Sequence, residues 1–323
     1  MSSADYDAIV CGGGVAGLAA ALWLGRYRRK TLLLDAGEQR NLPADRAHGY
    51  LTRDGATPQT ILAKAKEEVE NYETVDIQPL NAVSARRSGN SFAVETTDGP
   101  FTAQRLILCT GVQDEHPDIP GFEELYGTSL FHCPCCDGYE ACGLDVVVIG
   151  WGEHVAGYAL DLLEWGARVT VITNGESFQG DDACAVTLET HAVAVIEEKV
   201  ARYDAEDGKM RALHLESGNV VEAQMGFFSI AHHPRTELAE SLGCSLDADG
   251  YIEVGPHGET NVEGVFAAGD VTPGEQMVQV AASQGLIAGI QCARSLRGGS
   301  TAFGAPNPGP DSEAELDRAR DEV

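Results

Sequence analysis

The chain has 323 residues, 43% of them hydrophobic and 22% charged, which suits about two folded domains and excludes a disordered polymer. Its 22 Lys and Arg stand against 50 Asp and Glu, a net charge of -28. That charge excludes nucleic acid and anionic membranes as favoured partners. We interpret the acidity as a halophilic adaptation, with an ordinary solvated surface as the alternative.

The nine scattered cysteines do not match a small disulfide-stapled secreted domain. The apolar stretch 6–25 contains Asp7 and a run of three glycines, which favours strand, turn and helix over a signal peptide or membrane span. We therefore expect a cytoplasmic protein that does not bind membranes and whose thiols are mostly reduced.

The first predicted elements form a βαβ unit with parallel strands. Residues 6–11 predict a buried strand, 12–17 a turn, 15–27 a helix and 31–34 a second strand.

The turn of this unit has the glycine spacing of a dinucleotide site. Gly12 permits the tight turn, Gly14 lets a pyrophosphate approach the backbone, and Gly17 completes the pattern at the helix start. Asp35 ends the second strand, where an acid can accept hydrogen bonds from a ribose. The alternative is a tight turn without a ligand.

Further along the chain, Pro58 opens a predicted helix that runs to about Tyr72. Short alternating strands follow over about 83–105, and a buried strand covers 106–109.

A second βαβ unit begins about 140 residues after the first, with strands over 146–149 and 169–172 and a helix over 155–165. A repeated unit predicts two Rossmann-like domains in one chain. The segment 278–296 predicts a last helix of small residues.

One cysteine pair has redox spacing. Cys133 and Cys136 form a C-x-x-C motif, which permits an easily reduced disulfide and a thiolate of lowered pKa. Asp137 follows and can protonate a leaving thiolate. Cys135 lies between the pair and is interpreted as a packing residue or as a bystander without a role.

Two other interpretations of the motif stay open. The pair could bind zinc together with Cys142 and His132, although the regular second pair of a zinc site is missing. The cysteines could also be free and buried. No metal ligand is assigned.

Taken together, these motifs and their order resemble the low-molecular-weight thioredoxin reductases over residues 6–296. The shared features are the first glycine turn, the C-x-x-C-D-G at 133–138, a second glycine turn at 150–152 and Gly269-Asp270-Val271. The resemblance implies an α/β fold of two Rossmann-like domains, the second inserted in the first.

The resemblance also implies FAD as the cofactor and a homodimer, and the small residues of 281–293 suit close packing between subunits. The residues that would contact FAD are Gly12, Gly14, Gly17, Asp35, Arg40, Asn41, His48, Val83, Thr110, Gly111, Gly269, Asp270 and Gln279.

In this resemblance the redox roles are divided between the two cysteines. Cys136 would face the flavin, Cys133 would be the interchange thiol that attacks the substrate disulfide, and Asp137 would be the acid. The flavin carries the electron chemistry, and the protein positions the disulfide.

The second nucleotide turn departs from the family pattern. Thr173-Asn174-Gly175 stands where NADPH-using members place basic residues, so NAD(P)H binding is doubtful. Ferredoxin-dependent reductases fit this departure. So do dithiol oxidases of the gliotoxin and holomycin type, which Tyr139-Glu140 also resembles. Drift within a functional NADH site is the remaining interpretation.

We therefore expect an FAD-binding domain over 1–113 and 238–297, an NAD(P)-binding-like domain over 114–237 that carries the C-x-x-C, and a flexible acidic tail over 298–323. The expected enzyme is a flavin-dependent disulfide oxidoreductase. Its expected partner is a thioredoxin-like protein or a small disulfide, with ferredoxin as a candidate donor. The alternatives are a small-molecule dithiol oxidase that uses oxygen and a non-catalytic flavin redox sensor.

Overall fold

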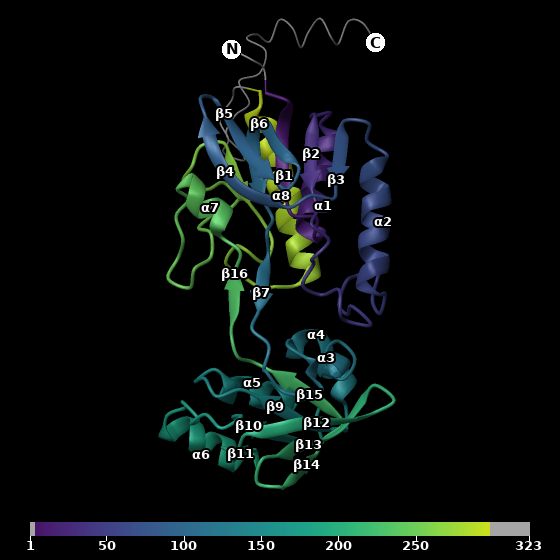
Figure 1. Cartoon of the computed structure of the whole chain (residues 1–323), viewed down its shortest axis with the longest axis vertical. Coiled ribbons are helices and arrows are strands. Elements are labelled where there is room, and N and C mark those ends of the chain that lie inside the picture. The colour runs from purple at the N-terminus through teal and green to yellow at the C-terminus, as the bar shows by residue number, and fades with distance from the viewer. Residues whose placement is uncertain (1–3, 298–323) are drawn as a thin grey trace, which may run out of the picture. The chain divides into compact units, whose positions relative to one another are not determined.

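The computed structural model describes residues 4–297, which form two compact units (Figure 1). The first contains residues 4–39, Leu62–Val112 and 234–297, and the second contains Arg40–Ile61 and Gln113–His233. The chain passes between them at β7 (Val112–Asp114) and β16 (His232–Pro234), which pair with each other. The expected tail over 298–323 lies outside the described residues.

The segment Arg40–Ile61 groups with the second unit, whereas the sequence analysis placed it in the first. Its contacts come from far along the chain. The Asp45 N–H donates to the Gly127 carbonyl at 2.9 Å. A Cβ on Gly127 would lie 2.2 Å from the Pro43 carbonyl oxygen, so only glycine allows this approach. No local sequence pattern signals such a contact.

The first unit is built on one sheet with the strand order β3-β2-β1-β6-β5-β4, and β17 also pairs with β6. The parallel strands are β1 (Tyr6–Cys11), β2 (Thr31–Leu34), β3 (Val75–Gln78), β6 (Gly99–Leu108) and β17 (Val265–Ala267), and β4 (Ala82–Ser88) and β5 (Ser91–Thr96) add an antiparallel extension. The predicted first βαβ unit is confirmed, because α1 (Val15–Arg26) connects β1 to β2.

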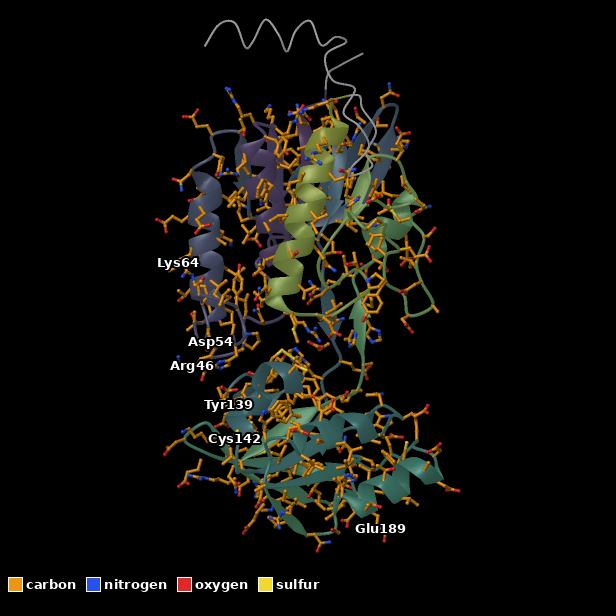
Figure 2. All side chains as sticks on the ribbon, turned by 180° about the vertical axis from the view of Figure 1, so that it is seen from behind. Arg46, Asp54, Lys64, Tyr139, Cys142 and Glu189 are labelled. Carbon is orange, nitrogen blue, oxygen red and sulfur yellow. A yellow bond between two sulfur atoms is a disulfide. The ribbon has the colours of Figure 1, made fainter. Side chains whose placement is uncertain are left out.

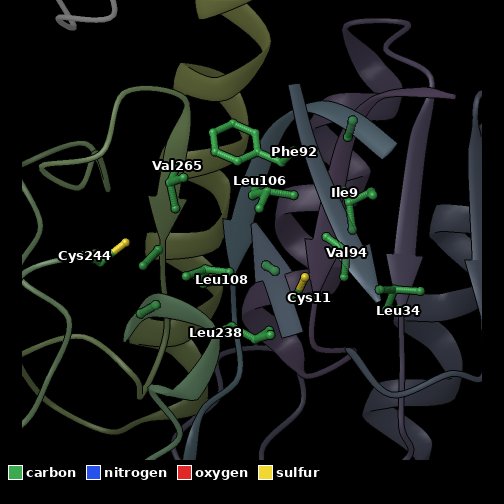
Figure 3. Packing of buried hydrophobic residues seen from close by; sticks show 14 of the residues in the cluster. Ile9, Cys11, Leu34, Phe92, Val94, Leu106, Leu108, Leu238, Cys244 and Val265 are labelled. Atoms are coloured by element: carbon green, nitrogen blue, oxygen red, sulfur yellow. The ribbon is translucent and has the colours of Figure 1, made fainter. Parts of the chain in front are cut away.

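Both faces of this parallel sheet are buried, which explains its nearly continuous apolar strands. Ile9 and Leu106 belong to a core cluster that includes Phe92 of β5 and Leu238 of α7 (Glu237–Leu242). Figure 3 shows these side chains converging from neighbouring strands and from α7. The same unit carries α2 (Pro58–Glu70) from Leu62 onwards, and α8 (Val278–Ser295).

The small residues of α8 pack against α1 of the same chain. A Cβ on Gly285 would lie 2.0 Å from the Ala16 carbonyl oxygen, and one on Gly289 would lie 2.7 Å from the Ala20 carbonyl oxygen. The two helix backbones therefore touch at these points. The predicted use of 281–293 as a dimer face is not supported, because close packing within the chain already explains these residues.

The second unit has a parallel sheet with the order β11-β10-β9-β15-β8. Its elements are β8 (Leu130–Phe131), β9 (Asp145–Ile149), β10 (Arg168–Ile172), β11 (Ala194–Ile196), β15 (Met225–Phe228), the antiparallel β12 (Val200–Glu206), β13 (Lys209–Leu215) and β14 (Val220–Glu222), and the helices α3 (Phe122–Leu125), α4 (Pro134–Asp137), η1 (Gly138–Ala141), α5 (Val155–Leu162) and α6 (Asp182–Thr190).

Alternate residues of β9 face two different layers of this unit. Val147 and Ile149 pack in one cluster with Leu213 of β13, while Val148 packs in another with Val155 of α5. The second predicted βαβ unit is thus confirmed, although α5 ends three residues before the predicted Trp165. Within residues 4–297, no helix is both long and apolar enough to cross a membrane.

Candidate active site

The first glycine turn lies at the carboxyl edge of the first unit's sheet. Gly12 has φ +118°, and a Cβ there would lie 2.1 Å from the Cys109 carbonyl oxygen. A Cβ on Gly17 would lie 1.9 Å from the Gly12 carbonyl oxygen. The two glycines therefore allow the turn itself to close, whether or not a ligand is bound.

Gly14 differs from its neighbours because it leaves open space. It is the N-cap of α1, has φ -72°, and contributes no side-chain cap to the first helical turn. A Cβ at this position would find its nearest neighbour, the Gln39 side chain, 3.9 Å away. An uncapped helix start behind a small, open residue fits the diphosphate of a dinucleotide such as FAD.

Asp35 lies beside this turn and is almost fully buried. The Lys66 ammonium lies 2.5 Å from its Oδ2, and Gln39 Nε2 donates to its Oδ1 at 2.7 Å. A Cβ on Gly13 would clash with the Asp35 carboxyl carbon at 2.1 Å. Lys66 comes from α2 and Gln39 from the loop after β2, so neither partner was identifiable from the sequence motif.

Two further predicted segments reach the same edge, because β1, β6 and β17 are parallel and end there. Thr110 follows β6, and its Oγ1 donates to the Arg235 carbonyl at 2.6 Å. Gly111 has φ +70° and accepts the Arg235 N–H. Gly269 follows β17, and a Cβ there would lie 2.8 Å from the Ala16 Cβ of α1.

The other residues predicted to contact FAD lie in different surroundings. Asp270 is half-buried and follows Gly269. Val83 is 58% exposed on β4, and Gln279 is exposed in the first turn of α8. Asn41 and His48 lie in the segment Arg40–Ile61 and belong to the second unit.

Arg40 also belongs to the second unit, where it forms a bidentate ion pair with Asp114. Arg40 Nε donates to Asp114 Oδ2 at 2.6 Å, and the second guanidinium nitrogen bonds Oδ1. Burial by itself would raise the pKa of Asp114, but the hydrogen bonds from Arg40, together with the charges of His132, Arg40 and His232, outweigh burial and lower the pKa. Within this unit, Arg40 therefore anchors the start of the segment that carries Asn41 and His48.

The redox motif forms a short helix that begins at a disulfide. Cys133 is bonded to Cys136. Cys133 is also the N-cap of α4, and its Sγ accepts the Cys136 N–H at 3.2 Å. This donor would stabilise negative charge on the Cys133 sulfur once the disulfide is reduced. Pro134 at the first helical position suits a helix start.

Two titratable groups flank the disulfide. Burial, and then the charge of Glu140, raise the pKa of Asp137 to about 7. Burial, and then Arg40, lower the pKa of His132 to about 4, so this imidazole is neutral at pH 7. Its Nδ1 hydrogen-bonds the Tyr126 hydroxyl at 3.1 Å. An acid with a pKa near neutrality can give or accept a proton beside the disulfide.

The Asp137→Asn variant is expected to flatten the pH dependence of stability. The pKa of Asp137 is about 7 in the folded chain and 3.8 ordinarily. The folded state therefore binds this proton more tightly, and its stabilisation is lost as the pH rises through about 7. The free energy of unfolding should fall between pH 4 and 8 by about 4 kcal/mol more in the parent than in Asp137→Asn.

Urea titrations of the FAD-bound protein across this pH range measure the difference. Asp118→Asn is the matched control, because Asp118 is an exposed carboxylate of the same unit. Equal pH slopes for the parent and Asp137→Asn would contradict the raised pKa.

The face around the disulfide carries further exposed groups. Cys135 and Cys142 are exposed free thiols, and Tyr139 is 74% exposed. Figure 2 labels Tyr139 and Cys142 among the side chains. Of the two interpretations of Cys135, exposure excludes the packing residue and leaves the bystander, because the short helix has no buried residue.

Side chains of the same chain lie against the second glycine turn and form hydrogen bonds there. A Cβ on Gly152 would lie 2.6 Å from the His154 ring, and His154 Nε2 hydrogen-bonds Ser229 Oγ at 2.9 Å. At the end of β10, the Thr173 Oγ1 donates to the Glu176 carbonyl, and Asn174 Oδ1 accepts the Val200 N–H at 3.0 Å. These groups are thus engaged within the chain.

The family described as pyridine nucleotide-disulphide oxidoreductase matches residues 6–285 of this chain. The chain belongs to this family. The thioredoxin reductase tcpT of Claviceps purpurea (strain 20.1) is 32% identical over 312 residues, which cover 92% of this chain and 96% of the relative. The thioredoxin reductase sirT of Leptosphaeria maculans is 32% identical over 306 residues, covering 88% and 92%.

A solved structure has a similar fold. The oxidoreductase from Agrobacterium tumefaciens is 34% identical with a TM-score of 0.83, and the match covers 91% of this chain and 99% of that one. The protein is therefore a thioredoxin reductase-like disulfide oxidoreductase, and membership of the family implies FAD. The predicted fold class of two Rossmann-like domains is confirmed.

Proposed function

We propose that this oxidoreductase exchanges electrons between bound FAD, the Cys133–Cys136 pair and a substrate disulfide, with a donor other than NADPH. The observation that carries the proposal is the disulfide at the start of α4 with the acid Asp137 directly beside it. The names of the relatives support a thioredoxin-like protein as substrate.

The thiol chemistry follows from the contacts of the two sulfurs. In the reduced pair, Cys133 is the thiolate favoured by the Cys136 N–H, so it attacks one sulfur of the substrate disulfide. A mixed disulfide forms between Cys133 and this sulfur, and the S–S bond of the substrate breaks. The departing thiolate takes a proton from Asp137. The Cys136 thiol gives its proton to Asp137 and attacks Cys133, which closes the disulfide and releases the second thiolate. This second thiolate takes its proton from water. The reaction needs this proton because Cys133 had already released its own to the solvent when it ionised.

The first unit would hold FAD along the carboxyl edge of its sheet. Gly14 and the start of α1 would accept the diphosphate, and Gly269 with Asp270 would reach it from the end of β17. Bound there, FAD would transfer electrons between the donor and the Cys133–Cys136 pair. Asp35 would contact the ribose only if Lys66 or Gln39 released it, because both contact its carboxylate.

The second glycine turn supports a donor other than NADPH. In an open α/β sheet a dinucleotide binds where the strand order reverses, which here is between β9 and β15. The hydrogen bond from His154 to Ser229 bridges the loops after these two strands. Thr173 and Asn174, at the site of the ribose phosphate, are bonded within the chain and carry no positive charge.

A small-molecule dithiol oxidase is the second candidate, and the exposed ring of Tyr139 beside the disulfide favours it. The single exposed ring of Tyr139 offers a small contact area. Such an area suits a compact apolar dithiol better than a protein substrate, which needs a large interface. In this direction the substrate dithiol reduces the Cys133–Cys136 disulfide, and oxygen is the final acceptor, reduced to peroxide.

Anaerobic flavin absorbance tests the donor. Neither NADPH nor NADH at micromolar concentration is expected to bleach the flavin within seconds, whereas reduced ferredoxin is expected to do so. Fast bleaching by NADPH would contradict the inference that the second glycine turn does not serve an NADPH donor. Bleaching by a small dithiol such as dithiothreitol, followed by peroxide formation in air without any nucleotide, would instead support the oxidase.

A further inference from the structure

A compact loop carries His48 to the redox motif within the second unit. Its ends are joined by a bridge between Ala47 and Ala56, and the Gly55 N–H donates to the Ala47 carbonyl at 2.9 Å. Asp54 Oδ1 accepts the Gly49 N–H at 2.9 Å. These bonds hold the loop around His48 in one shape.

The imidazole of His48 lies between two carboxylates. Its Nδ1 is 3.6 Å from Asp54 Oδ1, and its Nε2 is 3.4 Å from Glu140 Oε1. The Asp54 side chain is 73% exposed, the Glu140 side chain 34% and the His48 side chain 22%. Asp54 is thus the most exposed of the three groups, and the less exposed His48 connects it to Glu140, which lies in the turn that follows α4. A shift of a few tenths of an ångström in either carboxylate would complete each hydrogen bond.

Glu140 connects this series to the acid at the disulfide. It lies three residues after Asp137 along the consecutive helical turns of α4 and η1, and its charge raises the Asp137 pKa. Burial, together with charges that include Asp137, also raises the pKa of Tyr126 and Tyr158. The Tyr158 hydroxyl is buried without a hydrogen-bond partner in the described chain, so Tyr158 offers no equivalent route to solvent.

We propose that His48, held between Asp54 and Glu140, relays protons between solvent and Asp137 during thiol–disulfide exchange at Cys133–Cys136. Histidine suits this role because its ordinary pKa lies near neutrality and its two nitrogens can accept and donate in turn. When the second thiolate departs, the proton that it takes from water passes from Asp54 through His48 and Glu140 to Asp137, and Asp137 hands its own proton to the thiolate. His48 is a positioning and relay residue here, and this role rests on the proposed function.

The test compares two disulfide probes that differ in their need for a proton. Bis(2-hydroxyethyl) disulfide releases a basic thiolate that must be protonated, whereas 5,5′-dithiobis(2-nitrobenzoate) releases a thiolate that is stable without a proton. The full-length FAD-bound protein is reduced with dithiothreitol and desalted without air. Formation of the Cys133–Cys136 disulfide is then timed by alkylation and mass spectrometry, a readout that does not need flavin turnover.

In His48→Gln, exchange with bis(2-hydroxyethyl) disulfide is expected to slow by about tenfold, a modest share of an acid–base contribution. Exchange with the nitrobenzoate probe should change less than about twofold. The matched control is His191→Gln, at the exposed C-terminus of α6. The surface variant Asp54→Asn should give the same probe selectivity with a smaller loss, and it serves if His48→Gln fails to fold.

Three results would overturn the relay: equal slowing with both probes, no slowing with either, or loss of FAD from His48→Gln, which would make His48 a cofactor contact. A parent protein whose Cys133–Cys136 pair reacts with neither probe would instead contradict the proposed function itself, and the relay with it.

Discussion

Replacing Cys136 with Ser is expected to abolish disulfide turnover, a loss of at least about a thousandfold, while FAD stays bound. The pair acts as a unit, because Cys136 must attack Cys133 to close the disulfide and release the substrate thiolate. Cys133→Ser should have an effect of the same size, since it removes the thiolate that attacks the substrate. Steady-state reduction of a disulfide, with flavin absorbance read on the same sample, measures both quantities.

The neighbouring thiols provide matched controls for this result. Cys135 and Cys142 are exposed and lie outside the disulfide, so Cys135→Ser and Cys142→Ser should retain turnover within about threefold. Full activity of Cys136→Ser would overturn the assigned mechanism. Loss of FAD from that variant would show instead that the cysteine has a structural role in the cofactor site.

Gly17→Ala is expected to destabilise the first unit by about 3 kcal/mol or more and to release FAD. The added methyl group would lie 1.9 Å from the Gly12 carbonyl oxygen, which is backbone and cannot move without opening the turn. Urea unfolding followed by circular dichroism, with the flavin-to-protein absorbance ratio of the purified protein, measures both effects.

Gly14→Ala separates the fold of the turn from its ligand. The new methyl group would find its nearest neighbour 3.9 Å away, and φ is already -72°. Stability should therefore change by less than about 1 kcal/mol, while FAD affinity should drop by at least about tenfold, because the methyl group occupies the approach of the diphosphate. If Gly14→Ala binds FAD as the parent does, the diphosphate passes elsewhere.

The βαβ units were predictable because their signals are local. The apolar strands β1 and β2 begin and end where the sequence indicates, since burial on both sheet faces demands an uninterrupted apolar run. Gly12 and Gly17 were identifiable because a positive φ and a backbone contact each exclude a side chain. The spacing of Cys133 and Cys136 likewise determines their disulfide, since one helical turn brings the two sulfurs together.

The partners of the charged residues depended on the tertiary structure. Arg40 follows the first βαβ unit in sequence, and proximity in sequence suggested a cofactor contact, but its guanidinium pairs with Asp114, 74 residues away. Asp35 pairs with Lys66 of α2, and His48 with Glu140 of the redox motif. A charged side chain can meet any opposite charge that the folded chain brings near it, so its partner has no sequence signature.

Composition likewise did not determine which helix packs against the small residues of α8. Its small residues permit close packing with either a second subunit or a helix of the same chain, and the sequence favours neither. Gly285 and Gly289 are in contact with α1, because the sheet brings the first and last segments of the chain to adjacent positions. The sequence by itself determined the two βαβ units, the glycine turn of the first unit and the spacing of the cysteine pair. The tertiary structure alone decided which distant segments meet, because backbone and charge contacts between them leave no periodic pattern along the chain.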